Sequence, residues 1–266
     1  MLRYDSGMEA ADRLATAVDV VGTGPALRFE RIGKVFEDGT HALADVTFSV
    51  MPGEFVSMIG PSGCGKSTLL RIASGLTAPT TGRFSVASAN IGYVFQDPTL
   101  LQWRTVQANI ELLSELHGIA KRERRRLSAE AISLVGLAGF EKHYPRALSG
   151  GMKMRASLAR SLTLKPPVFL FDEPFGAIDE ITRDHLNIEL MRLFGIERFA
   201  ALFITHSINE AVYLSTRVHV MSARPGTIVA TFEVPFDYPR QEDLRYEPAF
   251  AELTGAVSHA LREAHS

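Results

Sequence analysis

The segment that decides the fold runs Gly60-Pro61-Ser62-Gly63-Cys64-Gly65-Lys66-Ser67, and it directly follows the apolar run Phe55–Ile59. It matches the pattern G-x-x-x-x-G-K-[ST], in which glycines let backbone N–H groups converge on phosphate oxygens. The residues after it, 68–74, have a helical pattern, so the loop stands between a strand and a helix. This context predicts a phosphate-binding loop. The alternative, a glycine-rich turn that happens to carry a lysine, does not explain the context.

Each polar side chain of this loop has an expected contact with a nucleoside triphosphate. Lys66 places a cation against the β- and γ-phosphates, the Ser67 hydroxyl binds Mg²⁺, and Thr68 hydrogen-bonds the α-phosphate. The backbone of residues 60–65 and the positive N-terminal end of the following helix complete the anion site. We therefore expect ATP and Mg²⁺ as the cofactors. Cys64 is the only cysteine, and without an indicated histidine partner its place is explained by backbone geometry and not by nucleophilic chemistry.

The composition is that of a globular protein with a substantial core. Of its 266 residues, 46% are hydrophobic and 22% are charged, and the formal net charge of −2 creates no field that favours nucleic acid. A single cysteine excludes a disulfide within the chain. No run of about 18 apolar residues lacks a charge, and the N-terminus has no signal-peptide pattern. We expect a cytoplasmic chain whose link to a membrane depends on a partner.

Short, nearly continuous apolar runs predict strands with both sheet faces covered by helices. Such runs occur at Phe55–Ile59, Val168–Phe171, Ala201–Ile204 and Val218–Met221. Helical patterns lie between them, so the fold class is α/β with a mainly parallel core sheet. Partly alternating runs at 26–32 and 44–50 predict antiparallel strands. We expect two further strands, near 83–87 and 91–95, to extend that antiparallel part.

The remaining segments define the domain organisation. Residues 1–25 are expected to be a mobile extension, and residues 26–266 a single domain. A helical subdomain at about 97–150 is inserted between core strands, and a helix over Pro248–Arg262 is expected near the end of the chain. Within the inserted part, the basic run Lys121–Arg126 is expected to be a solvated helix face.

Two carboxylates, Asp172 and Glu173, follow the buried run Val168–Phe171. In phosphoryl transfer an Asp at the end of such a strand holds Mg²⁺, and a neighbouring base orients the attacking water. An isolated Asp-Glu pair after a strand is most often a solvated loop start. The phosphate loop upstream reverses that preference here.

The sequence Leu148-Ser149-Gly150-Gly151-Met152, ahead of a helical run, resembles the signature of ABC transporter ATPase subunits. The order and spacing of the phosphate loop, this signature and the acidic pair resemble that family over residues 26–265. The resemblance implies a RecA-like P-loop NTPase core with an N-terminal antiparallel β subdomain and an inserted helical subdomain. It also implies a homodimer in the ATP-bound state, in which the small residues of the signature, at a helix N-terminus, close on ATP held by the opposite subunit.

The same resemblance assigns roles to five more residues. It implies that Glu173 is the general base, that Gln96 contacts Mg²⁺ and the water, and that His206 contacts the γ-phosphate. Asp179 matches the D-loop aspartate that crosses the dimer interface, and Phe36 falls where the family stacks an aromatic ring on adenine. Taken alone, each of these residues would be a surface or core side chain.

Several departures from the family pattern refine this interpretation. Met152 stands where Gln is commonest, which is familiar from importers of the nitrate, sulfonate and taurine type, and residues 223–229 resemble the ends of those ATPases. Phe36 replaces the common Tyr, and Gly176 and Ile178 replace Ser and Leu in the D-loop, a change that the sequence leaves without explanation. The segment from 81 to 96 is shorter than usual, which leaves the local sheet geometry open.

The resemblance also implies partners and a place in the cell. It implies transmembrane permease subunits, indirectly a substrate-binding protein, no nucleic acid, and a peripheral position on the cytoplasmic face of the inner membrane. Trp103, the only tryptophan, follows the loop that contains Gln96, which is called the Q-loop in this family. We expect Trp103 to contact the permease; the alternative is an ordinary surface position without a partner. The transported substrate stays open.

Four alternatives fit less well. A soluble ABC-type ATPase acting on DNA would need a long coiled coil, but only 148 − 60 = 88 residues separate Gly60 from Leu148. A translation-type member would usually carry two cassettes. A small-molecule kinase would leave the signature without a role, and an ATP-binding subunit with little turnover would not need both Glu173 and His206.

Overall fold

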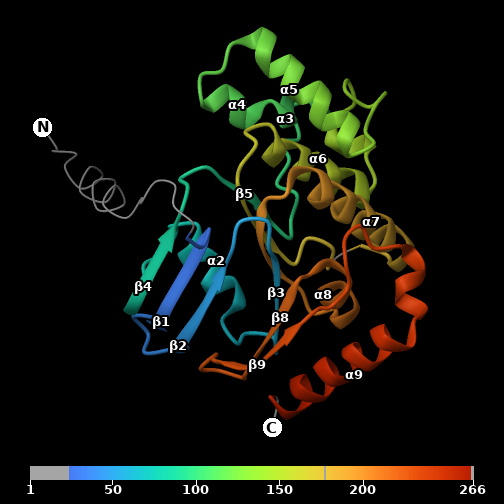
Figure 1. Ribbon diagram of the computed structural model, residues 1–266. Helices are drawn as coiled ribbons and strands as arrows, with labels where there is room; N and C mark the ends of the chain where they lie inside the picture. The colour runs from blue at the N-terminus through green and yellow to red at the C-terminus, as the bar shows by residue number, and fades with distance from the viewer. Residues whose placement is uncertain (1–23, 177, 265–266) are drawn as a thin grey trace, which may run out of the picture.

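The computed structural model describes residues 24–176 and 178–264 (Figure 1). The expected N-terminal extension, residues 1–25, lies outside this range except for Gly24 and Pro25. The core is a six-stranded sheet in the order β5-β6-β7-β3-β8-β9, parallel except for β9, which pairs antiparallel with β8. Its strands are β3 (Phe55–Ile59), β5 (Ile91–Val94), β6 (Val168–Asp172), β7 (Ala200–Ile204), β8 (Arg217–Met221) and β9 (Ile228–Glu233). The four continuous apolar runs are thus confirmed as core strands.

A second sheet of three antiparallel strands lies against the core, in the order β2-β1-β4. Its strands are β1 (Leu27–Val35), β2 (His41–Val50) and β4 (Thr81–Val86). One apolar cluster fills the space between the two sheets and α2 (Lys66–Ala73). The other apolar cluster lies on the opposite face of the core sheet, and it includes buried side chains of α6 (Gly150–Leu162), α7 (Glu180–Glu197) and α8 (Ile208–Leu214). The α/β P-loop architecture that the sequence predicts is therefore confirmed.

The prediction for residues 91–95 was wrong in one respect. The segment does not extend the antiparallel sheet; β5 pairs parallel with β6 at the edge of the core, with Ile91 opposite Val168. The chain changes sheet after β4, where the Asn90 amide donates to Leu164 O at 2.8 Å. Gly92 permits the approach to β6, because a Cβ there would lie 2.6 Å from Phe169 Cε1. A four-residue apolar run does not encode which neighbour it pairs with.

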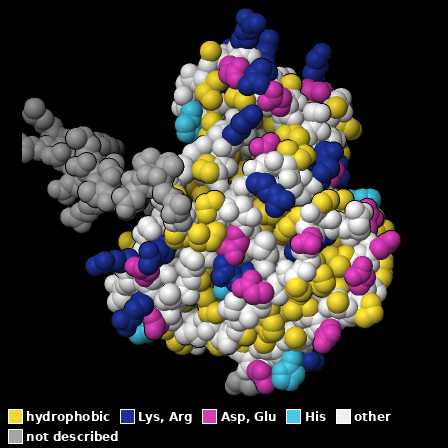
Figure 2. Space-filling model, in the orientation of Figure 1, with side chains coloured by type: hydrophobic (Ala, Val, Ile, Leu, Met, Phe, Trp, Pro, Cys, Tyr) yellow, Lys and Arg dark blue, Asp and Glu magenta, His cyan; other side chains and the backbone are white. Residues whose placement is uncertain are grey.

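The remaining helices form two groups. Three helices that follow β5 lie together at one end of the molecule, beyond α6, where Figure 2 shows basic side chains with acidic ones among them. They are α3 (Val106–Ile110), α4 (Leu112–Leu116) and α5 (Lys121–Leu134). On α5, Arg126 forms ion pairs with Glu123 at 2.6 Å and with Glu130, as expected of a solvated face. The last helix is α9 (Pro248–Glu263), close to the predicted bounds. Within the described residues, no helix has both the length and the apolar character that a membrane crossing requires.

Candidate active site

A cavity of about 250 Å³ opens at the phosphate loop, which lies between β3 and α2. Residues from four separate stretches of the chain line it. They are Phe36, Thr40 and Ala42 around the β1–β2 turn; Ser62, Gly63, Gly65, Lys66, Ser67 and Thr68; Glu173; and Arg224. The tertiary structure therefore brings the phosphate loop, the proposed adenine-stacking ring and the proposed base to one cavity.

The glycines of the phosphate loop are required by close packing and by backbone conformation. Gly65 has φ of +109°, and a Cβ there would lie 2.8 Å from Ala42 O. Gly63 also has a positive φ of +77°. Side chains would force the loop away from β2 and distort the curve that turns its N–H groups inward. The loop is thus a cradle of the kind that binds phosphate.

Lys66 is held across this cradle. Its side chain is buried, with 6% of the residue exposed, and its ammonium donates to Gly60 O at 2.8 Å and to Pro61 O at 2.9 Å. A buried ammonium whose partners are two carbonyls and the Cys64 sulfur, none of them an anion, retains a strong attraction for one. This arrangement places a cation where the phosphates of a bound nucleotide would lie.

Asp172, at the end of β6, connects the acidic pair to the phosphate loop. Its Oδ1 accepts a hydrogen bond from the Ser67 hydroxyl at 3.0 Å, and its Oδ2 accepts one from the Tyr93 hydroxyl at 3.4 Å. Burial raises the pKa of Asp172, and burial also raises the pKa of Tyr93. A hydroxyl and a carboxylate side by side are the hard oxygen ligands that Mg²⁺ prefers, so these residues fit the expected metal.

The Glu173 side chain points toward His206. Its Oε2 lies 3.5 Å from His206 Nδ1, and its backbone has φ of +45°, which is uncommon for a residue other than glycine. A hydrogen bond from Glu173 N–H to Ile204 O, at 3.0 Å, holds this conformation. Strained backbone of this kind persists where the surroundings fix it, and it is concentrated at functional sites.

Gly176 lies between two other candidate site residues. A Cβ built on it would lie 3.5 Å from Gln96 Nε2 and 3.5 Å from His206 Cε1. A Cβ at this position would make ordinary van der Waals contacts, so Gly176 marks the place where Gln96 and His206 lie close together. This geometry gives a physical setting for the glycine that the D-loop pattern left unexplained.

The signature residues are placed elsewhere. Ser149 is the N-cap of α6 and its Oγ accepts a hydrogen bond from Met152 N–H at 3.3 Å. Gly151 packs against α7, because a Cβ there would lie 2.4 Å from Thr182 Cγ2, whereas Gly150 faces open space. Among the residues that the structure describes, the lining of the phosphate-loop cavity includes none of Ser149–Met152.

Asp179 is likewise not part of the cavity lining that the structure describes. It caps α7 by accepting a hydrogen bond from Thr182 N–H at 3.0 Å, and this bond holds the pKa of Asp179 below its usual range. Its side chain is therefore fixed at an exposed helix start. The chain thus assembles a phosphate-loop cavity, and it presents Ser149, Gly150 and Asp179 on its surface outside the described lining of that cavity.

Further residues contact the site that were not predicted from the sequence. Arg224 lines the cavity, and its Nε and Nη2 donate to Gly63 O at 3.1 and 2.9 Å. Thr40 lines it from the β1–β2 turn, and Tyr93 reaches Asp172 from β5. Arg224 lies within residues 223–229, where the sequence indicated only a resemblance to importer ATPases of the nitrate, sulfonate and taurine type. The contact of Tyr93 depends on the parallel pairing of β5 with β6, which the sequence did not predict.

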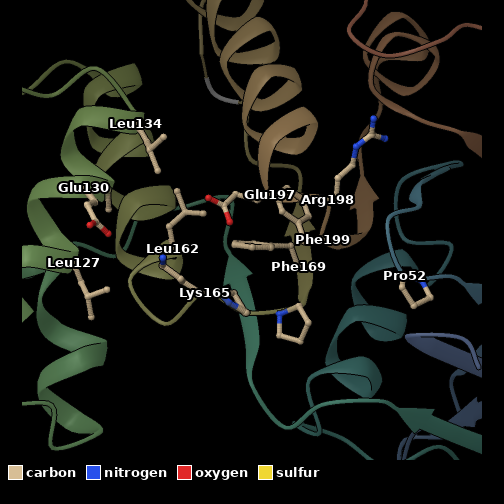
Figure 3. A pocket seen from close by; sticks show the side chains of 13 residues that line it. Pro52, Leu127, Glu130, Leu134, Leu162, Lys165, Phe169, Glu197, Arg198 and Phe199 are labelled. Carbon is tan, nitrogen blue, oxygen red and sulfur yellow. The ribbon is translucent and has the colours of Figure 1, made fainter. Parts of the chain in front are cut away.

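A larger cavity, of about 340 Å³, lies away from these residues, between α5, the start of β6 and the end of α7 (Figure 3). Its floor is apolar, with Leu134, Leu162, Phe169 and Phe199 among its lining residues, and charged side chains such as Lys165 border it. The described lining contains none of the residues that the motifs single out. Size alone therefore does not identify the active site.

Comparisons with known proteins place the chain in a family. The ABC transporter family model matches residues 43–176. An ABC transporter ATP-binding protein of Methanocaldococcus jannaschii is 44% identical over 247 residues, which cover 89% of this chain and 91% of that protein. The aliphatic sulfonates import ATP-binding protein of Pseudomonas syringae is 42% identical over 227 residues (85% and 92%). The nitrate import ATP-binding protein of Synechocystis is 40% identical over 234 residues (83% and 88%).

A solved structure supports the same conclusion. The dimeric structure of a bacterial ABC transporter cassette superposes with a TM-score of 0.68 at 29% identity, over 79% of this chain and all of that chain. The same cassette has been solved in a post-hydrolysis state bound to ADP and phosphate, at a TM-score of 0.69. The chain belongs to the ABC transporter ATP-binding family. It is an ABC-type ATPase that binds ATP, and nitrate and sulfonate import ATP-binding proteins are among its homologues.

Proposed function

We propose that this ATPase energises a binding-protein-dependent importer of the nitrate/sulfonate/taurine type and works as a head-to-tail homodimer. Residues 26–266 act as one ATPase domain with a helical subdomain at about 97–150. The proposed dimer rests on one observation: the phosphate loop and the signature at the start of α6 lie apart within one chain. The cavity has a complete phosphate loop, whereas Ser149 and Gly150 lie exposed at the start of α6. A second copy would supply the missing face.

In this proposal the phosphate loop binds the β- and γ-phosphates through its N–H groups and Lys66. Phe36 stacks on the adenine; its ring is 37% exposed at the cavity, with the Lys34 ammonium 5.3 Å from its centroid. Ser67, Asp172 and Gln96 hold Mg²⁺, which when bound neutralises charge on the phosphate oxygens. The Mg²⁺ assignment is supported by the oxygen donors that Ser67 and Asp172 present together.

The hydrolytic step follows from the positions of Glu173 and His206. Glu173 accepts a proton from the water that attacks the γ-phosphorus, and the bond between that phosphorus and the bridging oxygen breaks to release ADP and phosphate. His206, within 3.5 Å of Glu173, contacts the γ-phosphate. Asp179 and the signature of the partner subunit close the site from the other side. Hydrolysis removes the ATP that joins the two copies, so the dimer opens.

The importer assignment is supported by the similarity to the nitrate and sulfonate import proteins, over more than four fifths of the chain in each case. Trp103 is 75% exposed and follows the Q-loop, which suits an aromatic anchor for a permease subunit. The chain would then sit on the cytoplasmic face of the inner membrane as a peripheral subunit. The alternative is an ABC-type ATPase that is not linked to transport.

The dimer is tested by separating ATP binding from association. The Glu173→Gln variant is expected to form a dimer on addition of ATP, measured by light scattering after gel filtration. Adding Ser149→Arg should keep ATP affinity but leave the protein monomeric, because an arginine at the start of α6 blocks the partner's ATP. Ser133→Arg, an exposed serine of α5, is the matched control and should dimerise normally. Dimerisation of the Glu173→Gln/Ser149→Arg protein would contradict the head-to-tail arrangement.

The transport assignment is tested by reconstituting this chain with candidate permease and binding-protein subunits. In proteoliposomes, ATP hydrolysis should rise when the binding protein is loaded with its ligand, and nitrate, alkanesulfonates and taurine are the ligands to compare. A rate that is the same with and without the permease would favour the alternative.

A further inference from the structure

An ion pair with a buried carboxylate joins α7 and α8. Arg183 Nε is 3.6 Å from Glu210 Oε1, and Glu210 is only 6% exposed. Arg183 also donates through Nε to Phe175 O at 3.3 Å and through Nη2 to Ile178 O at 2.8 Å. One guanidinium therefore binds two backbone carbonyls of the D-loop and one buried carboxylate. Neither residue belongs to a motif that the sequence analysis used.

The other oxygen of Glu210 fixes the backbone around His206. Glu210 Oε2 accepts a hydrogen bond from the Thr205 hydroxyl at 2.5 Å, and Thr205 Oγ1 accepts one from Ser207 N–H at 3.0 Å. These two bonds involve the residues on either side of His206. Ser207 in turn caps α8 by accepting a hydrogen bond from Glu210 N–H at 3.3 Å. Glu210 is thus hydrogen-bonded to Thr205 and Ser207, the residues on both sides of His206.

The stability of the Arg183–Glu210 ion pair depends on the charges of both side chains. Burial raises the pKa of Glu210, while the Thr205 hydrogen bond, the Arg183 charge, His206 and a hydrogen bond from Asn187 lower it. A carboxylate this deeply buried is stable only while it is paired and hydrogen-bonded. Removing Arg183 leaves the carboxylate without this ion-pair partner and removes the guanidinium hydrogen bonds to the Phe175 and Ile178 carbonyls at the same time.

We propose that Arg183 and Glu210 form a positioning pair that couples the D-loop to His206. The D-loop reaches His206 directly at Gly176, and Arg183 anchors the carbonyls on either side of that contact. A shift of the D-loop moves Arg183, Arg183 moves Glu210, and Glu210 moves the backbone at Thr205 and Ser207. The inference rests on the proposed role of His206 in hydrolysis. Neither member of the pair is among the described residues that line the nucleotide cavity, so the pair acts on turnover and not on ATP binding.

The first test is Arg183→Met, which keeps the apolar stem and removes the guanidinium. Displacement of a catalytic group by about 1 Å costs on the order of 100-fold, so kcat should fall by about 30-fold while KM and the Kd for ATP change less than about twofold. Arg192→Met on the same helix is the matched control, because Arg192 is exposed and donates to Leu134 O on α5. Its kcat should equal that of the unmodified protein.

The second test is rescue. In Arg183→Met/Glu210→Gln the buried charge is gone and the amide oxygen still accepts from Thr205, so kcat should recover to within about fivefold of the unmodified protein. Thr205→Val breaks the same link without a charge change and should lower kcat with ATP affinity retained. These two variants also decide the matter if Arg183→Met alone does not fold.

The outcomes separate this inference from the proposed function. Loss of turnover in His206→Ala together with normal turnover in Arg183→Met would overturn the positioning pair alone. Normal turnover in His206→Ala would instead overturn the role of His206. A parallel loss of ATP affinity and kcat in Arg183→Met, without rescue by Glu210→Gln, would show a structural role only and would also overturn the inference.

Discussion

The Ser67 hydroxyl donates a hydrogen bond to Asp172 Oδ1 at 3.0 Å across 105 residues of sequence. This contact joins the phosphate loop, at the start of α2, to the end of β6. It exists because β3 and β6 both pair with β7 in the parallel sheet, so their carboxyl ends meet at one edge. Ligands of α/β sheets bind at such an edge, and the ATPase site follows this rule.

Asp172→Asn should weaken the binding of Mg²⁺ and leave nucleotide binding by the loop in place. The amide keeps the shape of the side chain and its bond to Ser67, but it lacks the charge that attracts the cation. We expect the Mg²⁺ concentration for half-maximal ATPase activity to rise by about tenfold or more, corresponding to about 1.4 kcal/mol. ATP affinity in EDTA is the control and should be unchanged. An unaltered Mg²⁺ requirement would exclude Asp172 as a ligand.

Glu173→Gln should retain ATP binding and lose hydrolysis. The amide does not accept a proton from water, and a lost general base costs about 100-fold to 10,000-fold in rate. Phosphate release and nucleotide affinity measure the two effects separately. Lys66→Ala is the contrasting variant, since it removes the buried cation of the loop and should abolish nucleotide binding itself. Near-normal turnover in Glu173→Gln would refute its role as the base.

Trp103→Ala should weaken recruitment to the permease more than it weakens ATP binding. The indole is 75% exposed, so its removal costs the isolated chain little, whereas a buried aromatic anchor at an interface is worth about 2 kcal/mol or more. Co-purification with the permease measures the first property, and a nucleotide titration measures the second. Leu116→Ala, another exposed apolar side chain, is the control. Equal recovery of permease with both variants would count against docking through Trp103.

His219 should make the folded state lose stability in mild acid. It is 3% exposed, its Nδ1 contacts Thr231 Oγ1 at 2.8 Å, and burial, with a smaller contribution from the Arg217 charge, lowers its pKa to about 4. The unfolded chain binds a proton below about pH 6.5, but the folded chain does not until about pH 4. The unfolded state therefore binds more protons in this window, and stability falls as the pH falls through it.

The measurement is urea unfolding at pH 7.5 and pH 5. Between these two pH values, the free energy of unfolding should fall by about 2 kcal/mol more in the unmodified protein than in His219→Leu. This figure follows from a slope of about 1.4 kcal/mol per pH unit below pH 6.5. His259→Leu, at an exposed position of α9, is the control, and its free energy of unfolding should fall by as much as that of the unmodified protein. An identical pH dependence for the unmodified protein and His219→Leu would show that His219 is not the group responsible.

The outcome for β5 shows where local pattern stops being informative. Residues 91–94 have the composition of a strand, and a strand forms there, but the antiparallel neighbour expected from the sequence was wrong. Pairing is decided by what lies beside the strand, here Val168–Phe171. Tyr93 reaches Asp172 only through this pairing, so its contact with the site could not be predicted.

The sequence by itself determined the phosphate loop, the buried parallel strands and the acidic pair, because each is encoded by contiguous residues with a local pattern. The identity of Lys66, Ser67, Asp172 and Glu173 as one set followed from motif order. Only the tertiary structure decided which side chains meet around them. It brought Arg224 to Gly63, placed Gly176 between Gln96 and His206, and buried Glu210 against Arg183. These contacts join residues far apart in the chain, and packing between separate strands and helices creates them.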